Sequence, residues 1–216
     1  WRTTSQAVKV NTNLFYMDYK NQLVLTGAID DVGAPIRATS GKSYRLGLEI
    51  DADIQLLKNL KVLPNAAFST NKNVDFVTSR DGSLVNLGNT NTSFSPEIVI
   101  GNRLEYSPLK NLQFGLLSKF VGEQYMGNID SDASKLDSYF VHDLNIVYTL
   151  TDVPVVKSIV FTGLVNNVFN EKYVSNGYFF TYDDDFSVPG EITTIEGAGY
   201  YPQAEINFLL GATIKF

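Results

Sequence analysis

The stretch SYRLGLEIDADIQL, residues 43–56, limits what this chain can fold into more than any other part of it. Every second residue from Tyr44 to Leu56 is apolar, and charged residues such as Arg45 and Asp51 occupy the positions between. A period of two predicts a β-strand with one apolar and one polar face. A soluble sheet buries its apolar face. A membrane barrel instead turns that face toward lipid and lines a wet interior with the charges.

The same alternation recurs along the chain, and it predicts an all-β protein. Each segment has 12 to 16 residues, whereas strands of globular proteins have roughly 5–6. Tilted membrane strands need about 9–11 residues in the hydrocarbon region, which these lengths satisfy. Helices are expected to be minor, because no long window carries apolar residues at a spacing of 3.6. The eight predicted strands are 6–19, 42–57, 61–76, 94–107, 112–125, 139–150, 157–168 and 202–216.

The predicted connections alternate between short and long. Short ones lie at 58–60, at 108–111 and from Thr151 onward, and long ones cover 20–41, 77–93, 126–138 and 169–201. In up-and-down outer-membrane barrels, short turns lie at the periplasmic rim and long loops at the extracellular rim. The pattern therefore predicts an antiparallel up-and-down transmembrane β-barrel segment of about eight long strands.

Aromatic residues near the predicted strand ends support a membrane location, because girdles of such residues mark both interfaces of a membrane barrel. The alternative is that they are ordinary edge aromatics of a soluble sheet. The residues concerned are Tyr44, Tyr106, Tyr125, Tyr139, Tyr148 and Phe216. The last strand, AEINFLLGATIKF, places every second residue from Ala204 on one face and stops at Phe216. A terminal aromatic of this kind looks like the signal by which the barrel assembly machinery recognises its substrates.

Composition excludes several classes of function. The chain has no Cys, and hence no disulfide or thiolate metal site. A single His, His142, rules out multi-histidine metal sites; it falls among the apolar positions of its strand and is expected to be structural. Seventeen basic against 23 acidic residues argue against nucleic-acid binding. Glu49, Asp51 and Asp53 have no base or nucleophile nearby in sequence, so we expect interior charges, no enzyme and no cofactor.

Several stretches resemble the C-terminal barrel of TonB-dependent outer-membrane receptors, especially those of Bacteroidetes-type bacteria. They are LFYMDYKNQLVLTGAIDDVGAPIRATSGKSYRLGLEIDA at 14–52, SKFVGEQYMGN at 118–128, LVNNVFNEKYVSNGY at 164–178 and YYPQAEINFLLGATIKF at 200–216. The resemblance implies a barrel of about 22 strands around a plug domain. Residues 1–216 are then expected to be the C-terminal portion of the barrel, without the plug, in a chain that is processed or a fragment.

The resemblance also implies a function. Such receptors sit in the outer membrane of Gram-negative bacteria and take up a bulky, scarce solute such as a ferric siderophore, energised by TonB through an N-terminal region. Vitamin B12, other chelates and glycans are further solutes to consider. Outer-membrane lipid, TonB and the barrel assembly machinery are the expected partners. The alternative is a complete eight-strand barrel that serves as a membrane anchor or surface-interaction protein.

The richest candidate for ligand binding is YFFTYDDDF at 178–186. Tyr178, Phe179, Phe180 and Tyr182 offer flat amphipathic surfaces, and Tyr200 and Tyr201 are expected to complete an aromatic rim. Asp183, Asp184 and Asp185 are candidate oxygen ligands for a hard cation such as Ca²⁺. The alternative for these three is a solvated acidic loop that shields the barrel mouth.

Two other long connections differ in what they predict. Residues 26–43 contain Asp30 and Asp31 with Arg37 of opposite sign, and the resemblance implies an ordered outer loop in which Arg37 lies near the ligand. Residues 79–93, SRDGSLVNLGNTNTS, are polar and predict a mobile surface excursion.

Overall fold

The computed structural model describes residues 1–3, 7–30, 32–151 and 153–216, and its main feature is one sheet of long antiparallel strands. Position 6 of the first predicted strand, Asp31 and Asp152 lie outside the described residues. The eight predicted strands are confirmed. They are β1 (Val8–Lys20), β4 (Lys42–Leu57), β5 (Leu60–Val74), β9 (Ile98–Leu109), β10 (Leu112–Val121), β13 (Tyr139–Leu150), β14 (Ser158–Asn166) and β17 (Asn207–Lys215).

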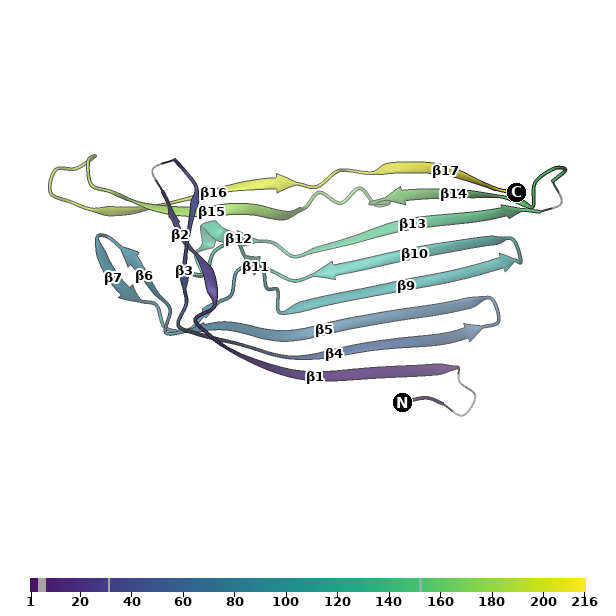
Figure 1. Cartoon of the computed structure of the whole chain (residues 1–216), viewed down its shortest axis with the longest axis horizontal. Helices are drawn as coiled ribbons and strands as arrows, with labels where there is room; N and C mark the ends of the chain where they lie inside the picture. Colours follow the sequence, from purple (N-terminus) through teal and green to yellow (C-terminus); the bar gives the residue numbers. More distant parts are fainter. Residues whose placement is uncertain (4–6, 31, 152) are drawn as a thin grey trace.

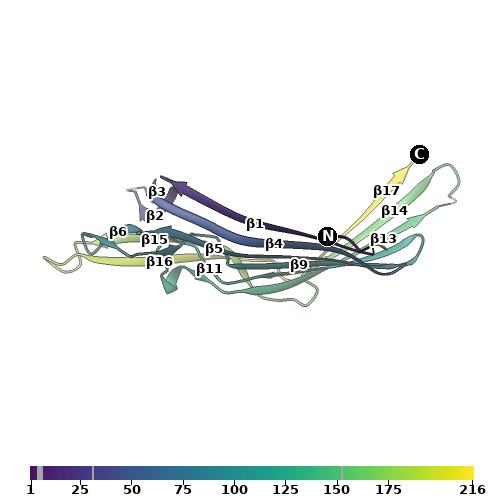
Figure 2. The same cartoon turned by 90° about the horizontal axis from the view of Figure 1, so that it is seen from below.

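The eight strands pair in chain order, as an up-and-down topology requires. The order is β1-β4-β5-β9-β10-β13-β14-β17, with the short β8 (Thr90–Asn91) also paired to β5. Short turns gather at one end of the sheet and long connections at the other (Figure 1). The sheet is curved, and β1 and β17 form its two edges (Figure 2). These edge strands do not pair with each other in the described part of the chain, so the sheet is open there.

The register places most of the apolar residues of the eight strands on one face, which we call the apolar face. Leu48 of β4 stands opposite Leu14 of β1 and Phe68 of β5, for example. Cross-strand contacts satisfy polar groups on the other face, which we call the polar face. Asn13 donates to Glu49 at 3.0 Å, and Asn11 donates to Asp51 at 2.8 Å. Ion pairs also lie on the polar face: Asp53 of β4 pairs with Lys61 of β5 at 2.9 Å, and Arg103 pairs with Glu105 of the same strand at 2.8 Å.

Three polar residues interrupt the apolar face at the same level. Asn102, Ser118 and His142 are register partners on β9, β10 and β13. The Ser118 hydroxyl and Nδ1 of His142 are 2.8 Å apart, so each satisfies the other. The imidazole also lies edge-on to two rings, 4.3 Å from Phe140 and 4.9 Å from Phe169 between ring centres. A hydrogen-bonded pair and flanking rings explain how a histidine is accommodated among apolar side chains.

The predicted aromatic girdles are partly confirmed. Tyr44, Tyr106 and Tyr148 lie on the apolar face near strand ends, and Tyr16 stacks on Tyr44 at 6.3 Å. Two assignments are wrong. Tyr139 lies on the polar face, where it stacks on Tyr173 at 4.4 Å. Tyr125 belongs to a connection, because β10 ends at Val121 rather than at 125.

The four long connections are folded, and together they form what we call the outer layer. Four of their strands make a separate sheet in the order β16-β15-β2-β3. Apart from β8, the elements of the layer are β2 (Leu23–Ile29), β3 (Pro35–Thr39), β6 (Val77–Arg80), β7 (Ser83–Asn86), β11 (Gln124–Tyr125), the 3-10 turn η1 (Asp132–Ser134), β12 (Lys135–Leu136), β15 (Val174–Asp184) and β16 (Thr193–Pro202).

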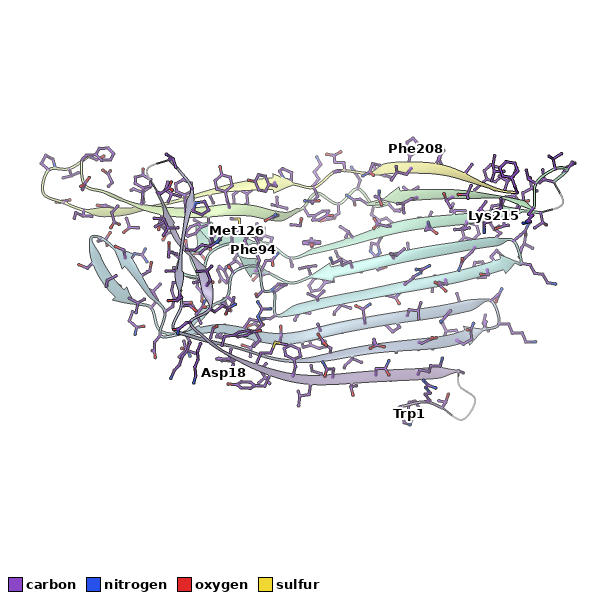
Figure 3. The ribbon with its side chains drawn as sticks, viewed as in Figure 1. Trp1, Asp18, Phe94, Met126, Phe208 and Lys215 are labelled. Atoms are coloured by element: carbon purple, nitrogen blue, oxygen red, sulfur yellow. The ribbon has the colours of Figure 1, made fainter. Side chains whose placement is uncertain are left out.

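The buried residues cluster in and beside this layer, because the long strands form a single sheet with no layer packed along most of its length. Buried apolar side chains include Phe76, Met126 and Leu136, and Figure 3 places Met126 within the layer. The amide of Asn128 ties several connections together. It donates to the carbonyl of Leu25 at 2.9 Å and accepts from the Ser93 N–H at 2.9 Å. Within the described ranges, no helix has the length and apolar character needed to cross a membrane.

Candidate functional site

Four aromatic rings line one face of the β15–β16 hairpin, and we call them the aromatic ladder. Tyr178, Phe180 and Tyr182 project on the same side because side chains alternate along a strand. The ring centres of Tyr178 and Phe180 are 6.2 Å apart and those of Phe180 and Tyr182 6.5 Å apart, with interplanar angles of 18° and 16°. Tyr201 of β16 adds a fourth ring, 6.0 Å from Tyr178. These side chains form a continuous aromatic surface.

Glycines on the partner strand create the room for these rings. Gly199 stands opposite Tyr178, and Gly197 stands opposite Phe180. A Cβ at either glycine would overlap the facing ring. The rings therefore lie across the backbone of β16, yet the tyrosines remain accessible: Tyr178 is 51%, Tyr182 41% and Tyr201 53% exposed. Ordered, exposed aromatic surfaces bind flat or apolar parts of ligands.

Two of the predicted ligand residues, Phe179 and Tyr200, are not part of the ladder. Phe179 projects on the opposite face of β15, where its ring lies against Gly127 of another connection. Tyr200 also faces that way, and its hydroxyl donates to the carbonyl of Ala133 at 3.1 Å. Strand alternation separates them from Tyr178, Phe180, Tyr182 and Tyr201. Their contacts fix the hairpin to the rest of the outer layer.

The β6–β7 hairpin docks on the same hairpin, so the prediction of a mobile excursion at 79–93 is wrong. The N–H of Asp81 donates to the Thr194 hydroxyl, and the N–H of Thr194 donates to the Asp81 carboxylate, each at 2.7 Å. Arg80 and Glu196 form an ion pair at 3.4 Å. The hydroxyl of Ser131 hydrogen-bonds Glu196 from a third connection. The β15–β16 hairpin that carries the ladder is therefore held in place by contacts with two other connections.

Two of the three aspartates at the hairpin tip, Asp183 and Asp184, serve the fold of the outer layer. Asp183 accepts from the hydroxyls of Thr194 at 2.6 Å and Ser79 at 3.3 Å. Asp184 accepts from the N–H groups of Phe186 and Ser187 at 3.2 and 3.0 Å. A side-chain hydrogen bond from Ser187 and these backbone bonds hold the pKa of the Asp184 carboxyl below its usual range. The metal prediction gains no support, since the described residues contain no group of three or more His, Cys, Asp or Glu arranged to hold a metal ion.

The connection at 26–43 lies beside the ladder hairpin, and one backbone bridge joins the two in the described part of the chain. Ala28 of β2 pairs with Thr181 of β15. Arg37 is exposed on β3, opposite Leu25, and no contact joins it to the ladder within the described ranges. Asp30 closes the β2–β3 turn by accepting from the Val32 and Ala34 N–H groups at 3.0 and 2.7 Å. A ligand role for Arg37 stays a prediction.

The segment NNVFNEKY organises the start of the β14–β17 connection. Asn167 has a left-handed backbone, with φ of 51°. Its side chain both accepts from the N–H and donates to the carbonyl of Glu171, each at 2.8 Å. Its own N–H donates to Asp143 of β13 at 2.8 Å. This part of the resemblance thus marks a structural turn that orients β15.

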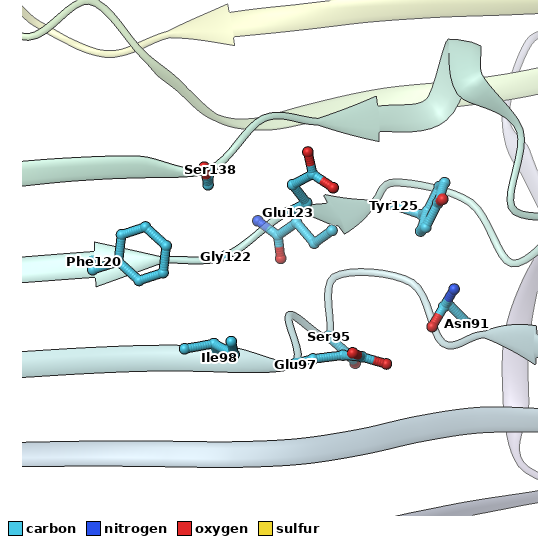
Figure 4. Close-up of a pocket in the computed structure, with 10 residues that line it drawn as sticks. Asn91, Ser95, Glu97, Ile98, Phe120, Gly122, Glu123, Tyr125 and Ser138 are labelled. Carbon is cyan, nitrogen blue, oxygen red and sulfur yellow. The ribbon is translucent and has the colours of Figure 1, made fainter.

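A second candidate site is a pocket of about 420 Å³ where β9 and β10 reach the outer layer (Figure 4). Ile98 and Phe120 of the apolar face line it together with Glu97 and Glu123. Both carboxylates are paired to lysines, Glu97 to Lys72 at 3.7 Å and Glu123 to Lys135 at 2.8 Å. The hydrogen bond that Lys135 donates to the Glu123 carboxylate raises the pKa of the Lys135 ammonium. Since the pocket includes none of the predicted ligand residues and its acids are already paired, the ladder is the stronger candidate.

Phe216 directly follows β17 and is 78% exposed. Its position at the end of an edge strand is compatible with recognition by another protein. Its role as an assembly signal stays a prediction.

Comparison with known proteins identifies the fold. Three similar solved structures are the ferric-catecholate import receptor Fiu from E. coli K12 (TM-score 0.65, 18% identity), the siderophore receptor PiuA from Acinetobacter baumannii (0.61, 14%) and the ferric yersiniabactin uptake receptor FyuA from Yersinia pestis (0.63, 14%). The matches cover 100%, 99% and 100% of this chain, but only 26%, 27% and 28% of those proteins. The chain thus spans about a quarter of their length.

No curated protein matches the chain in sequence. The Bacteroidetes-type resemblance is not addressed by these comparisons and stays a prediction. A family model described as "TonB dependent receptor-like, beta-barrel" matches residues 1–168. The family and the similar structures are receptors and transporters. The family match agrees with the long strands and with the separation of short turns and long connections to opposite ends of the sheet. The chain belongs to the TonB-dependent receptor β-barrel family, whose members lie in the outer membrane of Gram-negative bacteria.

Proposed function

We propose that this chain is the barrel portion of an outer-membrane receptor that takes up a bulky, scarce solute, and that the aromatic ladder is part of the surface that first binds the solute. The observation that carries the proposal is the ladder itself. It is exposed, it is held on a braced hairpin, and it lies at the end of the sheet where the long connections gather. A ferric siderophore is the solute class that the family resemblance favours.

The intact receptor supplies what these residues do not include. Transport is energised by TonB through an N-terminal region, with a plug domain inside the completed barrel. The apolar face contacts outer-membrane lipid, and the barrel assembly machinery inserts the strands. The open sheet supports this reading over the alternative of a closed eight-strand anchor, because β1 and β17 need further strands to satisfy their free edges.

Uptake of radioactive iron, supplied as ferric siderophores to cells with and without TonB, tests the function. The expected result is accumulation that requires both the receptor and TonB. Uptake that is the same without TonB would contradict the proposal.

Binding by the purified intact receptor tests the role of the ladder. Phe180→Ala and Tyr178→Ala each remove a ring on which the ligand can stack. An aromatic pair is worth about 0.5–1.5 kcal/mol, so each variant should bind the ligand roughly 2- to 12-fold more weakly. The matched control is Leu84→Ala, which truncates an apolar side chain of the outer layer that is 80% exposed and outside the ladder. Unchanged affinity in Phe180→Ala, Tyr178→Ala and their double variant would remove the ladder from the binding surface.

A further inference from the structure

The formal charge of the chain is divided sharply between its two ends. The four long connections, residues 21–41, 75–97, 122–138 and 167–206, contain sixteen acidic and four basic residues, a formal charge of −12. The strands and short turns contain seven acidic and thirteen basic residues, a formal charge of +6. All four long connections lie at one end of the sheet (Figure 1). The overall charge of −6 thus hides a strongly negative outer layer.

The hairpin that carries the ladder is the most one-sided part of this layer. Residues 174–202 include five acidic side chains and no Lys, Arg or His. Asp184 projects on the same side of β15 as Phe180 and Tyr182, because the three alternate along one strand. Arg80 comes from another connection, but it is already engaged in the ion pair with Glu196. Asp183 and Glu196 project on the opposite face of the hairpin. A ligand on the ladder therefore meets aromatic faces, tyrosine hydroxyls and the Asp184 carboxylate directly, and the negative charge of the rest of the hairpin through the field that it creates.

The electrostatic field of this negative surface discriminates among ligands by their charge. Clefts and surfaces of one sign raise the local concentration of ligands of opposite sign and lower that of ligands of the same sign. Aromatic faces add to this preference, since the negative face of the ring attracts cations. Ferric chelates differ greatly in charge: three singly charged hydroxamates neutralise Fe³⁺, whereas three doubly charged catecholates leave a complex with three negative charges.

We propose that the aromatic ladder and its acidic surroundings select neutral or positively charged ferric chelates, of the hydroxamate class, and disfavour trianionic ferric catecholates. This inference rests on the proposed function and narrows its substrate class. The aromatic faces contact the organic backbone of the chelate, and the carboxylates of the hairpin attract any ammonium group it carries. A trianionic chelate finds no free basic side chain on the hairpin to offset the carboxylates.

The test measures binding of three purified chelates to the intact receptor in detergent, at low and at high salt. The probes are the ferric complexes of desferrioxamine B (cationic), ferrichrome (neutral) and enterobactin (trianionic). We expect the cationic complex to bind at least about tenfold more tightly than the trianionic complex at low salt. The difference should shrink as salt rises, because the Debye length falls from about 30 Å at 0.01 M to about 10 Å at 0.1 M.

Two variants with equal changes in charge locate the effect. The hairpin variant is Asp183→Asn/Asp184→Asn/Asp185→Asn, and the control is Glu49→Gln/Asp51→Asn/Asp53→Asn on the polar face of β4. The preference for the cationic complex should shrink in the hairpin variant and persist in the control. The inference is overturned if the trianionic complex binds as tightly as the others at low salt, or if the hairpin variant keeps the full preference. Failure of all three chelates to bind would instead overturn the siderophore function, and this inference with it.

Discussion

Asp81 and Thr194 exchange two hydrogen bonds across 113 residues of sequence, each residue donating its N–H to the side chain of the other at 2.7 Å. The pair joins the turn of the β6–β7 hairpin to the start of β16. It fixes two connections that leave the sheet from β5 and β14, strands separated by β9, β10 and β13. The two hydrogen bonds are polar and exposed, so their contribution to the stability of the outer layer depends on their geometry rather than on burial.

Asp81→Ala should loosen this brace without unfolding the sheet. Each net hydrogen bond contributes about 0.5–1.5 kcal/mol, and the substitution removes one such bond and destabilises a residue with φ of 51°. Hydrogen–deuterium exchange should become faster in residues 77–86 and 193–196 and stay unchanged in β4 and β13. Ser83→Ala, on the same hairpin, is the control. Equal exchange in the two variants would show that the pair does not hold the hairpins together.

Gly199→Ala and Gly197→Ala should displace the rings of the ladder. A methyl group at either position overlaps the facing ring, and overpacking of this kind costs roughly 1–3 kcal/mol. Weaker ligand binding and faster proteolysis of the hairpin are the expected results. Gly115→Ala on β10 is the control, because its new Cβ would be 3.7 Å from Asn145, an ordinary contact. Retained affinity in both hairpin variants would mean that ring placement does not matter for binding.

The long strands could be predicted from sequence because their signal is local. The period of two predicts a strand over 42–57, and β4 spans the same residues. The alternation is informative even without a buried core, because in membrane barrels it separates a lipid-facing side from a water-facing side. The same logic placed His142 among apolar positions, where it lies.

The structure of the outer layer is harder to predict from sequence, because it depends on contacts between segments that are far apart in the chain. Asp81–Gly82 was a readable signal for a two-residue hairpin turn, with φ of 51° and 70°. The docking of that turn on Thr194 has no local signature. Phe179 could have been separated from Phe180 by strand alternation, had 174–184 been recognised as a strand. The girdle assignment of Tyr125 failed because its strand ends four residues earlier.

Ser118→Ala should destabilise the barrel by leaving His142 without its partner on the apolar face. An unsatisfied buried polar group costs about 1–3 kcal/mol. Thermal unfolding of the intact receptor in detergent should occur at lower temperature. The double variant Ser118→Ala/His142→Phe should recover most of the loss, because replacing both partners by apolar groups removes the unpaired donor or acceptor. If the single and double variants are equally destabilised, the hydrogen bond is not the cause.

Asn167→Ala should disturb the turn that leads from β14 to β15. The substitution removes two side-chain hydrogen bonds to Glu171 and places Ala at φ of 51°. Together these changes cost about 3–4 kcal/mol locally, from roughly 1 kcal/mol for each of the two hydrogen bonds and 1–2 kcal/mol for a left-handed residue. Asn167→Gly retains the backbone freedom and should lose only the hydrogen-bond part. Faster exchange of the amide of Glu171 is the readout, and identical exchange in the two variants would exclude backbone strain.

The hairpin tip should weaken in acid because of Asp184. Its pKa lies below the ordinary value of 3.8, held down first by the side-chain hydrogen bond from Ser187 and then by the N–H groups of Ser187 and Phe186. A carboxyl whose pKa is lower in the folded state stabilises that state above its unfolded pKa, and the stabilisation is lost as the pH falls through the folded pKa. The tip is therefore fully braced at neutral pH. Exchange protection of the Phe186 and Ser187 amides, followed from pH 5 downward, should fall with a midpoint below 3.8. Ser187→Ala removes the largest cause and should raise that midpoint toward 3.8, whereas an unchanged midpoint would show that another group controls the turn.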